Sequence, residues 1–167
     1  MKRIIVIGSS GSGKSTFSRR LGEAIDVEVI HLDKLYWLPN WVEPSKAEWA
    51  ATVRDLIERG SWIIDGNYGG TLAMRLDAAD TVIFLDLPRA TCIFRVLKRN
   101  WQYRGKSRPE MADGCVERLD LKFLLWVWNF RKQKRPRLLA QLAESPEKNV
   151  VILCSNREVE EFLEHRL

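Results

Sequence analysis

Residues 8–15 read Gly-Ser-Ser-Gly-Ser-Gly-Lys-Ser, which is the glycine, lysine and hydroxyl spacing of a phosphate-binding P-loop. The glycines let successive backbone N–H groups point at an anion, and the helix that follows presents its positive end to the same place. Lys14 adds a charge against the β- and γ-phosphates, and Ser15 offers its hydroxyl to Mg²⁺. We therefore predict ATP and Mg²⁺ as cofactors. The expected nucleotide-binding residues of the loop are Gly8, Ser9, Ser10, Gly11, Ser12, Gly13, Lys14, Ser15 and Thr16.

Two aspartates come directly after two later apolar runs, where a phosphotransferase needs carboxylates. Asp65 is a candidate for holding Mg²⁺ or substrate, and the alternative is a turn aspartate before Gly66. Asp33 is a candidate for accepting a proton from an acceptor hydroxyl, or for holding the metal or the acceptor. Its alternative is a turn or helix cap. His31 fits a structural group better than a catalytic one.

Arg95 and Arg99 are four residues apart on a predicted helix and therefore share one face. Such a pair suits phosphates or a base, with Arg99 as a catalytic candidate, and the alternative is a solvated helix face. Asp86 precedes this helix and is expected to cap it. The polar segment after the helix resembles a mobile lid that brings charge to the γ-phosphate. The basic residues of that segment are Arg104, Lys106 and Arg108.

Seven tryptophans are an unusual share of 167 residues. Trp49, Trp62 and Trp126 fit core positions. Trp37 and Trp41 flank a loop directly after Asp33, where an acceptor would enter, so Trp37 is a candidate wall for the substrate. The alternative is a loop pinned by its own aromatic packing.

The rest of the chain alternates apolar runs with helical stripes. Strands are predicted at 4–7, 27–32, 62–64, 81–85 and 149–153. Helices are predicted at about 14–25, 44–60, 71–76, 88–103 and 115–130, from Pro136, and from Ser155, with Ser-x-x-Glu capping boxes at Ser45 and Ser155. Strands that are apolar throughout and separated by helices indicate a parallel sheet covered on both faces. The fold class is therefore α/β, a three-layer P-loop NTPase with a five-stranded parallel sheet and a helical lid. Ligands bind at the carboxyl ends of such strands.

Length and composition indicate one domain over 1–167, with an acceptor-side helical region at 34–60 and a basic helical lid at about 100–137. No apolar stretch reaches the roughly 18 residues that cross a bilayer, and no signal peptide is expected. Three widely spaced cysteines favour reduced thiols and the cytoplasm. Residues 89–137 contain 14 basic and 4 acidic side chains, which suits a solvated surface, a polyphosphate clamp or a nucleic-acid face.

The P-loop, Asp65-Gly66 and the Asp86-Leu87-Pro88 string with its downstream arginines resemble adenylate kinase and related nucleoside monophosphate kinases. The strings at 30–37, 64–71 and 128–130 are similar to the bacterial DNA topology modulation, or FlaR-like, proteins. The resemblance implies a kinase-like core with Lys14 on the phosphates, Arg95 near the base and Arg99 near the phosphates. Adenylate kinases continue the Asp-Gly string with Phe-Pro-Arg, whereas this chain continues with Asn67, so Arg75 is the nearest arginine left to bind the acceptor.

The favoured hypothesis is an ATP- and Mg²⁺-dependent phosphotransferase acting on a small molecule or a nucleotide. The first alternative is an ATP-binding, DNA-associated protein that uses the basic 89–137 segment, with nucleic acid a less favoured partner. A further alternative is a nucleotide-gated protein whose aromatic helix engages a partner. No membrane contact is expected, and the sequence does not indicate an oligomeric state.

Overall fold

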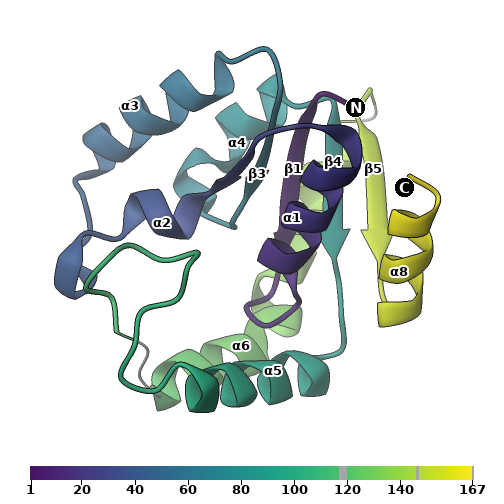
Figure 1. The fold of residues 1–167 in the computed structure, drawn as a ribbon. Coiled ribbons are helices and arrows are strands. Elements are labelled where there is room, and N and C mark those ends of the chain that lie inside the picture. The colour runs from purple at the N-terminus through teal and green to yellow at the C-terminus, as the bar shows by residue number, and fades with distance from the viewer. Residues whose placement is uncertain (117–119, 146, 167) are drawn as a thin grey trace.

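The computed structural model describes residues 1–116, 120–145 and 147–166, and its centre is a five-stranded sheet (Figure 1). All recorded strand pairings are parallel, and the strand order is β2-β3-β1-β4-β5. The strands are β1 (Arg3–Gly8), β2 (Val29–His31), β3 (Trp62–Asp65), β4 (Thr81–Leu85) and β5 (Asn149–Leu153). The predicted three-layer α/β P-loop NTPase fold is thereby confirmed.

Helices connect the strands and cover both faces of the sheet. The α-helices are α1 (Lys14–Ile25), α2 (Leu32–Tyr36), α3 (Lys46–Ile57), α4 (Gly69–Ala78), α5 (Arg89–Gln102), α6 (Leu121–Gln133), α7 (Arg135–Ala143) and α8 (Asn156–Glu164), with a 3₁₀ turn η1 (Pro39–Trp41). Ser45 and Glu48 form the reciprocal capping box that starts α3, as expected. The Ser155 hydroxyl likewise accepts from the Glu158 N–H and caps α8. The Glu158 carboxylate accepts from the Cys154 N–H, rather than from the Ser155 N–H as in a reciprocal box.

The alternation of side chains along each strand divides the core into two layers. Ile4 and Val6 of β1 pack with Phe17 and Leu21 of α1, and with side chains of α5, α6 and α8. Ile5 and Ile7 point the other way, into a layer formed with α3, α4, α6 and α7. This second layer contains Trp49 and Trp62, and Trp126 packs against it partly buried, as expected. The central strands are therefore buried on both faces, and polar residues follow their carboxyl ends.

The structure corrects three predicted elements. β2 ends at His31 rather than at residue 32, because Leu32 turns its buried side chain into the core and begins α2. α6 begins at Leu121 rather than near Cys115, because the Cys115 thiol and the Val116 carbonyl are held by residues 38–41. The predicted helical positions 117–119 lie outside the described residues. β5 is largely half-exposed rather than buried, since it is an edge strand.

Candidate functional site

The P-loop connects β1 to α1 and depends on glycines at three positions. Gly8, Gly11 and Gly13 have φ values of 151°, 79° and 95°, which side chains rarely tolerate. A Cβ on Gly8 would lie 2.5 Å from the Leu85 carbonyl oxygen, and one on Gly11 would collide with the Cys92 carbonyl. Contacts from β4 and α5 therefore shape the loop, so that its curvature is fixed by the tertiary fold.

The amino end of α1 has the properties of an anion site. Its N-cap, Gly13, supplies no side-chain hydrogen bond, and the first turn contains no acidic residue. The first-turn N–H groups thus have no partner within the helix, and the helix dipole is not neutralised there. The Lys14 amine donates to the carbonyls of Gly8 (3.1 Å) and Ser9 (2.9 Å). Burial lowers the pKa of Lys14 below its usual value, and the charges of Asp33 and Asp65 offset only part of this shift.

Asn67 fastens the P-loop to the segment after β3, a role that the sequence analysis missed. Its side-chain amide accepts from the Gly8 N–H at 3.1 Å and donates to the Gly8 carbonyl at 2.8 Å. Both hydrogen-bonding groups of the first loop glycine are thereby satisfied by one side chain. Its position two residues after Asp65 was visible in the sequence, but the pairing joins residues 59 apart and depends on β1 lying beside β3.

Asp65 ends β3, is 4% exposed and borders the cavity. Its Oδ2 lies 3.0 Å from Nδ1 of His31, the last residue of the neighbouring strand β2. Burial lowers the pKa of His31, but the hydrogen bond and charge of Asp65 outweigh burial, so its pKa is raised. The structural role expected of His31 is thus orientation of the Asp65 carboxylate.

Asp33 lies in the first turn of α2, so a short helix follows it where a loop was predicted. The Tyr68 hydroxyl donates to Asp33 Oδ1 at 2.7 Å. Burial, together with the Asp33 charge, raises the pKa of Tyr68, which keeps this hydroxyl a donor. Tyr68 comes from the segment after β3, so two neighbouring strand ends fix one carboxylate.

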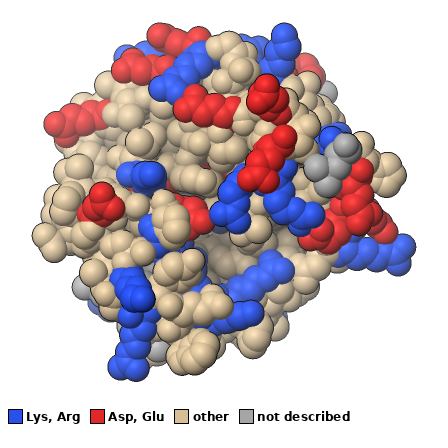
Figure 2. Space-filling view, in the orientation of Figure 1, with Lys and Arg blue, Asp and Glu red and all other residues tan. Residues whose placement is uncertain are grey.

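An open cavity of about 460 Å³ lies at the carboxyl edge of the sheet, where these groups meet. It is bordered by Ser10–Thr16 of the P-loop and α1, by Asp33 and Asp65, and by Arg95 and Arg99 of α5. Arg95 donates to the Ser12 carbonyl (3.1 Å) and to Asn156 at the start of α8 (2.9 Å), so this arginine is no freely solvated side chain. Figure 2 shows the hollow on the face toward the viewer, with basic side chains along its rim.

Two predicted substrate-binding residues are placed away from this cavity. Arg75 is fully buried, and its guanidinium donates to the backbone carbonyls of Gly66, Asn67 and Tyr68 at 2.6–3.1 Å. Burial lowers its pKa to about 10. Trp37 makes edge contacts with Tyr36 and Trp41, which is the pinned aromatic loop given as its alternative. Arg75 thus holds the segment that carries Asn67 and Tyr68.

The predicted lid segment crosses from α5 to the opposite wall of the cavity. Arg108 and Glu110 border the cavity, and the backbone beyond them contacts η1 and the residue before it. The Cys115 thiol lies 3.3 Å from the Leu38 carbonyl, and the Trp41 indole N–H donates to the Val116 carbonyl at 3.2 Å. The segment after α5 is thereby attached to the segment that follows Asp33.

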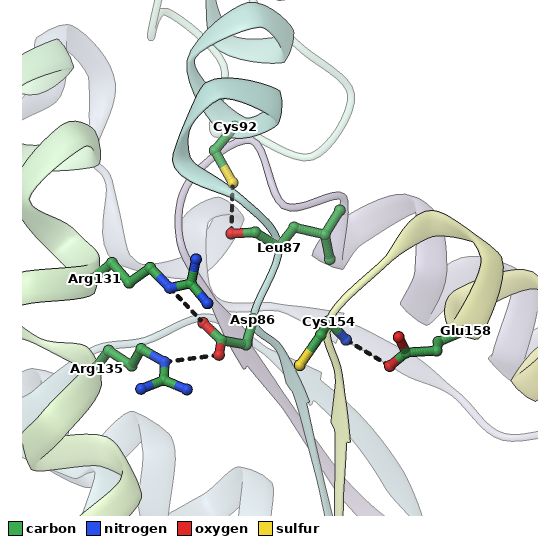
Figure 3. Close-up of polar contacts among 7 residues, drawn as sticks. All are labelled: Asp86, Leu87, Cys92, Arg131, Arg135, Cys154 and Glu158. Atoms are coloured by element: carbon green, nitrogen blue, oxygen red, sulfur yellow. Dashed lines mark hydrogen bonds and ion pairs between the residues drawn. The ribbon is translucent and has the colours of Figure 1, made fainter.

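The predicted capping role of Asp86 is wrong. The N-cap of α5 is Pro88, and no side chain caps that helix. Asp86 is buried and accepts from Arg135 Nε at 2.7 Å, while Arg131 Nε lies at 3.9 Å from its other oxygen (Figure 3). The carboxylate instead fastens the junction of α6 and α7 to the end of β4. A cap needs only local sequence, whereas this pairing spans 49 residues.

The site fits a nucleotide and a magnesium ion. The glycine cradle and the uncapped start of α1 suit phosphate anions. The Ser15 hydroxyl and the Asp65 carboxylate, which border the same cavity, are the hard oxygen donors that Mg²⁺ prefers. Groups of three or more His, Cys, Asp or Glu side chains that could hold a metal are absent from the part of the chain that the structure describes. A site of this kind would thus rely on water and phosphate for its remaining ligands.

A family model described as an AAA domain matches residues 4–113, which contain the P-loop, Asp33, Asp65 and α5. The chain belongs to this AAA domain family. A curated relative of this AAA domain chain is the uncharacterized protein YqaC of Bacillus subtilis strain 168. It is 26% identical over 128 residues, which span 75% of this chain and 71% of YqaC.

Solved kinases share the fold of this AAA domain protein. A gluconokinase from Sinorhizobium meliloti 1021 aligns with a TM-score of 0.59 and 17% identity, over 99% of this chain and 89% of the other. A shikimate kinase from Acinetobacter baumannii, solved with shikimate, aligns with a TM-score of 0.63 and 15% identity, over 99% and 90%. A putative kinase from Chloroflexus aurantiacus aligns with a TM-score of 0.55 and 14% identity, over 98% and 97%. The chain therefore has a P-loop kinase-like fold.

Proposed function

We propose that the protein is an ATP- and Mg²⁺-dependent phosphotransferase that acts on a small molecule or a nucleotide. The observation that carries this proposal is the open cavity at the carboxyl edge of the sheet. An uncapped helix start and Lys14 form one wall, Asp33 and Asp65 a second, and Arg95 and Arg99 a third. This arrangement combines the anion site, the metal-binding oxygens and the cations that phosphoryl transfer requires.

Each group has a role in this proposal. Lys14 and Arg99 bear on the transferred phosphoryl group, and Arg95 lies on the nucleotide side. Ser15 and Asp65 would hold Mg²⁺, which would offset the negative charge of the phosphates. Asp33 accepts the proton of the acceptor hydroxyl. The hydroxyl oxygen bonds to the γ-phosphorus as the bond between that phosphorus and ADP breaks. Positioning by Tyr68 directs the carboxylate toward that task.

We extend the proposal to the organisation of the chain. Residues 34–60 form the acceptor side and residues of about 100–137 a lid, which the contact between 114–116 and 38–41 supports. The resemblance to nucleoside monophosphate kinases and to DNA topology modulation proteins supports the same chemistry. Three free thiols support a reducing, cytoplasmic compartment.

The basic segment 89–137 supports this function better than binding to DNA. Arg95, Arg99 and Arg108 border the cavity, and Arg131 and Arg135 face Asp86. Five of its basic side chains are therefore directed toward the site or the core. Nucleic-acid binding would draw instead on the outward-facing charges of the segment.

The test is nucleotide binding followed by phosphoryl transfer. We expect calorimetry to detect ATP binding with Mg²⁺ present, and a panel of hydroxylated metabolites and nucleoside monophosphates to include one that stimulates ADP release. Lys14→Ala should abolish transfer, and Asp33→Asn should slow it by about a hundredfold or more with ATP affinity retained. Lys2→Ala, an exposed lysine just before β1 and at the amino edge of the sheet, away from the cavity, is the matched control.

Absence of ATP binding by the wild-type chain would refute the proposal. ATP binding without turnover on any acceptor, combined with salt-dependent affinity for DNA that falls on neutralising Arg104 and Lys106, would favour the DNA-associated alternative instead.

A further inference from the structure

Two neighbouring helices expose apolar side chains at helical spacing on their outer sides. On α5 these are Phe94, Leu97 and Trp101, and on α6 they are Leu121, Leu125 and Trp128, all between 42% and 78% exposed. We call these six residues the α5–α6 face. Spacings of three, four or seven residues place the members of each set on one side of their helix.

The two sets adjoin one another. α5 and α6 pack together at the base of the molecule in Figure 1. The Arg89 guanidinium at the start of α5 lies 4.5 Å from the centre of the Trp128 ring, so the start of α5 lies beside the second half of α6. The buried residues Val96 and Val127 lie on the opposite, inner sides. The face is therefore one outer surface about 20 Å long, as the lengths of the helices require.

The charges within the two helices have one sign, and the exposed Asp120 lies just before α6. Neither α5 nor α6 contains an acidic residue within its bounds. Arg89 and Lys98 flank the apolar residues on α5, and Lys122 and Lys132 do so on α6, all exposed. A second copy placed symmetrically on this face would bring these cations together. A partner surface with anionic groups on its outside and an apolar interior would complement both the cations and the apolar side chains of the α5–α6 face.

We propose that the α5–α6 face docks on the surface of an anionic lipid bilayer. Indole rings and leucines enter the boundary between headgroups and acyl chains, to a depth of about 5–10 Å, while lysine and arginine pair with lipid phosphates. Among the described residues, no helix combines the length and apolar character of a bilayer-crossing segment, so the attachment lies on the membrane rather than through it. The expectation of no membrane contact considered only crossing segments.

The test is flotation of the purified chain with vesicles, which needs no enzymatic activity. We expect binding to vesicles of phosphatidylcholine and phosphatidylglycerol in equal parts, and at least tenfold weaker binding to phosphatidylcholine alone. Trp101→Ser combined with Trp128→Ser should weaken binding by about tenfold or more. Lys98→Gln and Lys122→Gln should each weaken it by about fivefold, with the effect reduced at high salt.

Matched controls separate this surface from general stickiness. Val42→Ser removes an equally exposed apolar side chain outside the face, and Lys46→Gln removes an exposed charge on α3; both should bind vesicles as the wild type does. The face variants should keep the wild-type thermal midpoint because their side chains are exposed. Absence of binding to the anionic vesicles would overturn the proposal. Binding that the controls weaken as much as the face variants do would overturn it too, as would a concentration-dependent dimer lost in the Trp101→Ser, Trp128→Ser variant.

Discussion

The pairing of Asp86 with Arg135 allows a quantitative test of how α6 and α7 are attached to the sheet. Asp86 is 4% exposed, and its hydrogen bond to Arg135 Nε is 2.7 Å long, whereas Arg131 lies at 3.9 Å. A hydrogen bond to a charged group contributes about 1.5–3 kcal/mol, and an exposed ion pair about 0.2–1 kcal/mol. Because Arg135 is about one third exposed, we expect its coupling to Asp86 near the lower end, about 1–2 kcal/mol.

The assay is a double-mutant cycle followed by urea unfolding and tryptophan fluorescence. Asp86→Asn should lower the free energy of unfolding by about 1–3 kcal/mol, with the denaturant slope unchanged. Its coupling to Arg135→Gln should be about 1–2 kcal/mol, and its coupling to Arg131→Gln below about 0.5 kcal/mol.

The competing explanation, a helix cap, makes a different prediction. Asparagine caps helices about as well as aspartate, so Asp86→Asn would then be nearly neutral and additive with Arg135→Gln. A neutral Asp86→Asn, or a coupling to Arg131 as large as that to Arg135, would refute the pairing as the origin of this stability.

Three further results are expected. Gly11→Ala should lower the free energy of unfolding by about 2–4 kcal/mol and weaken ATP binding in calorimetry. The reason is that Gly11 has a φ of 79° and an added Cβ would collide with the Cys92 carbonyl. The control is Gly70→Ala, which has open space around it and should change the free energy of unfolding by less than about 1 kcal/mol. Arg75→Met should lower the free energy of unfolding in urea by about 3 kcal/mol or more, because it leaves buried carbonyls unpaired. Unchanged stability together with a raised KM for the acceptor would instead show that Arg75 binds the substrate. Burial raises the pKa of Asp80, but the N–H groups of Lys2 and Arg3 outweigh burial and hold its pKa below 3.8. The stabilisation that the Asp80 carboxylate provides is therefore present above pH 3.8 and lost as the pH falls below it. The difference in free energy of unfolding between wild type and Asp80→Ala should thus narrow as the pH is lowered. A difference that widens would contradict a lowered pKa for Asp80.

The sequence predicted the elements whose signals are local. The P-loop spacing, the apolar strands and the Ser45 capping box each depend on residues within a few positions, so their assignment needed no tertiary information. The order of strand ends and loops also placed Asp33 and Asp65 at one edge, because all parallel strands present their carboxyl ends there.

The tertiary structure decided which partner each polar side chain has. Asn67 on Gly8, Arg75 on the carbonyls after β3, and Asp86 on Arg135 are pairings of this kind. The sequence indicated no role for Asn67, and it suggested a substrate contact for Arg75 and a helix cap for Asp86. Hydrogen-bond energies of a few kcal/mol depend on tenths of an ångström, and only the packing of strands and helices brings donors and acceptors to that distance. Hydrophobic periodicity encodes which side of an element is buried, whereas the identity of the group that lies opposite is a property of the assembled fold.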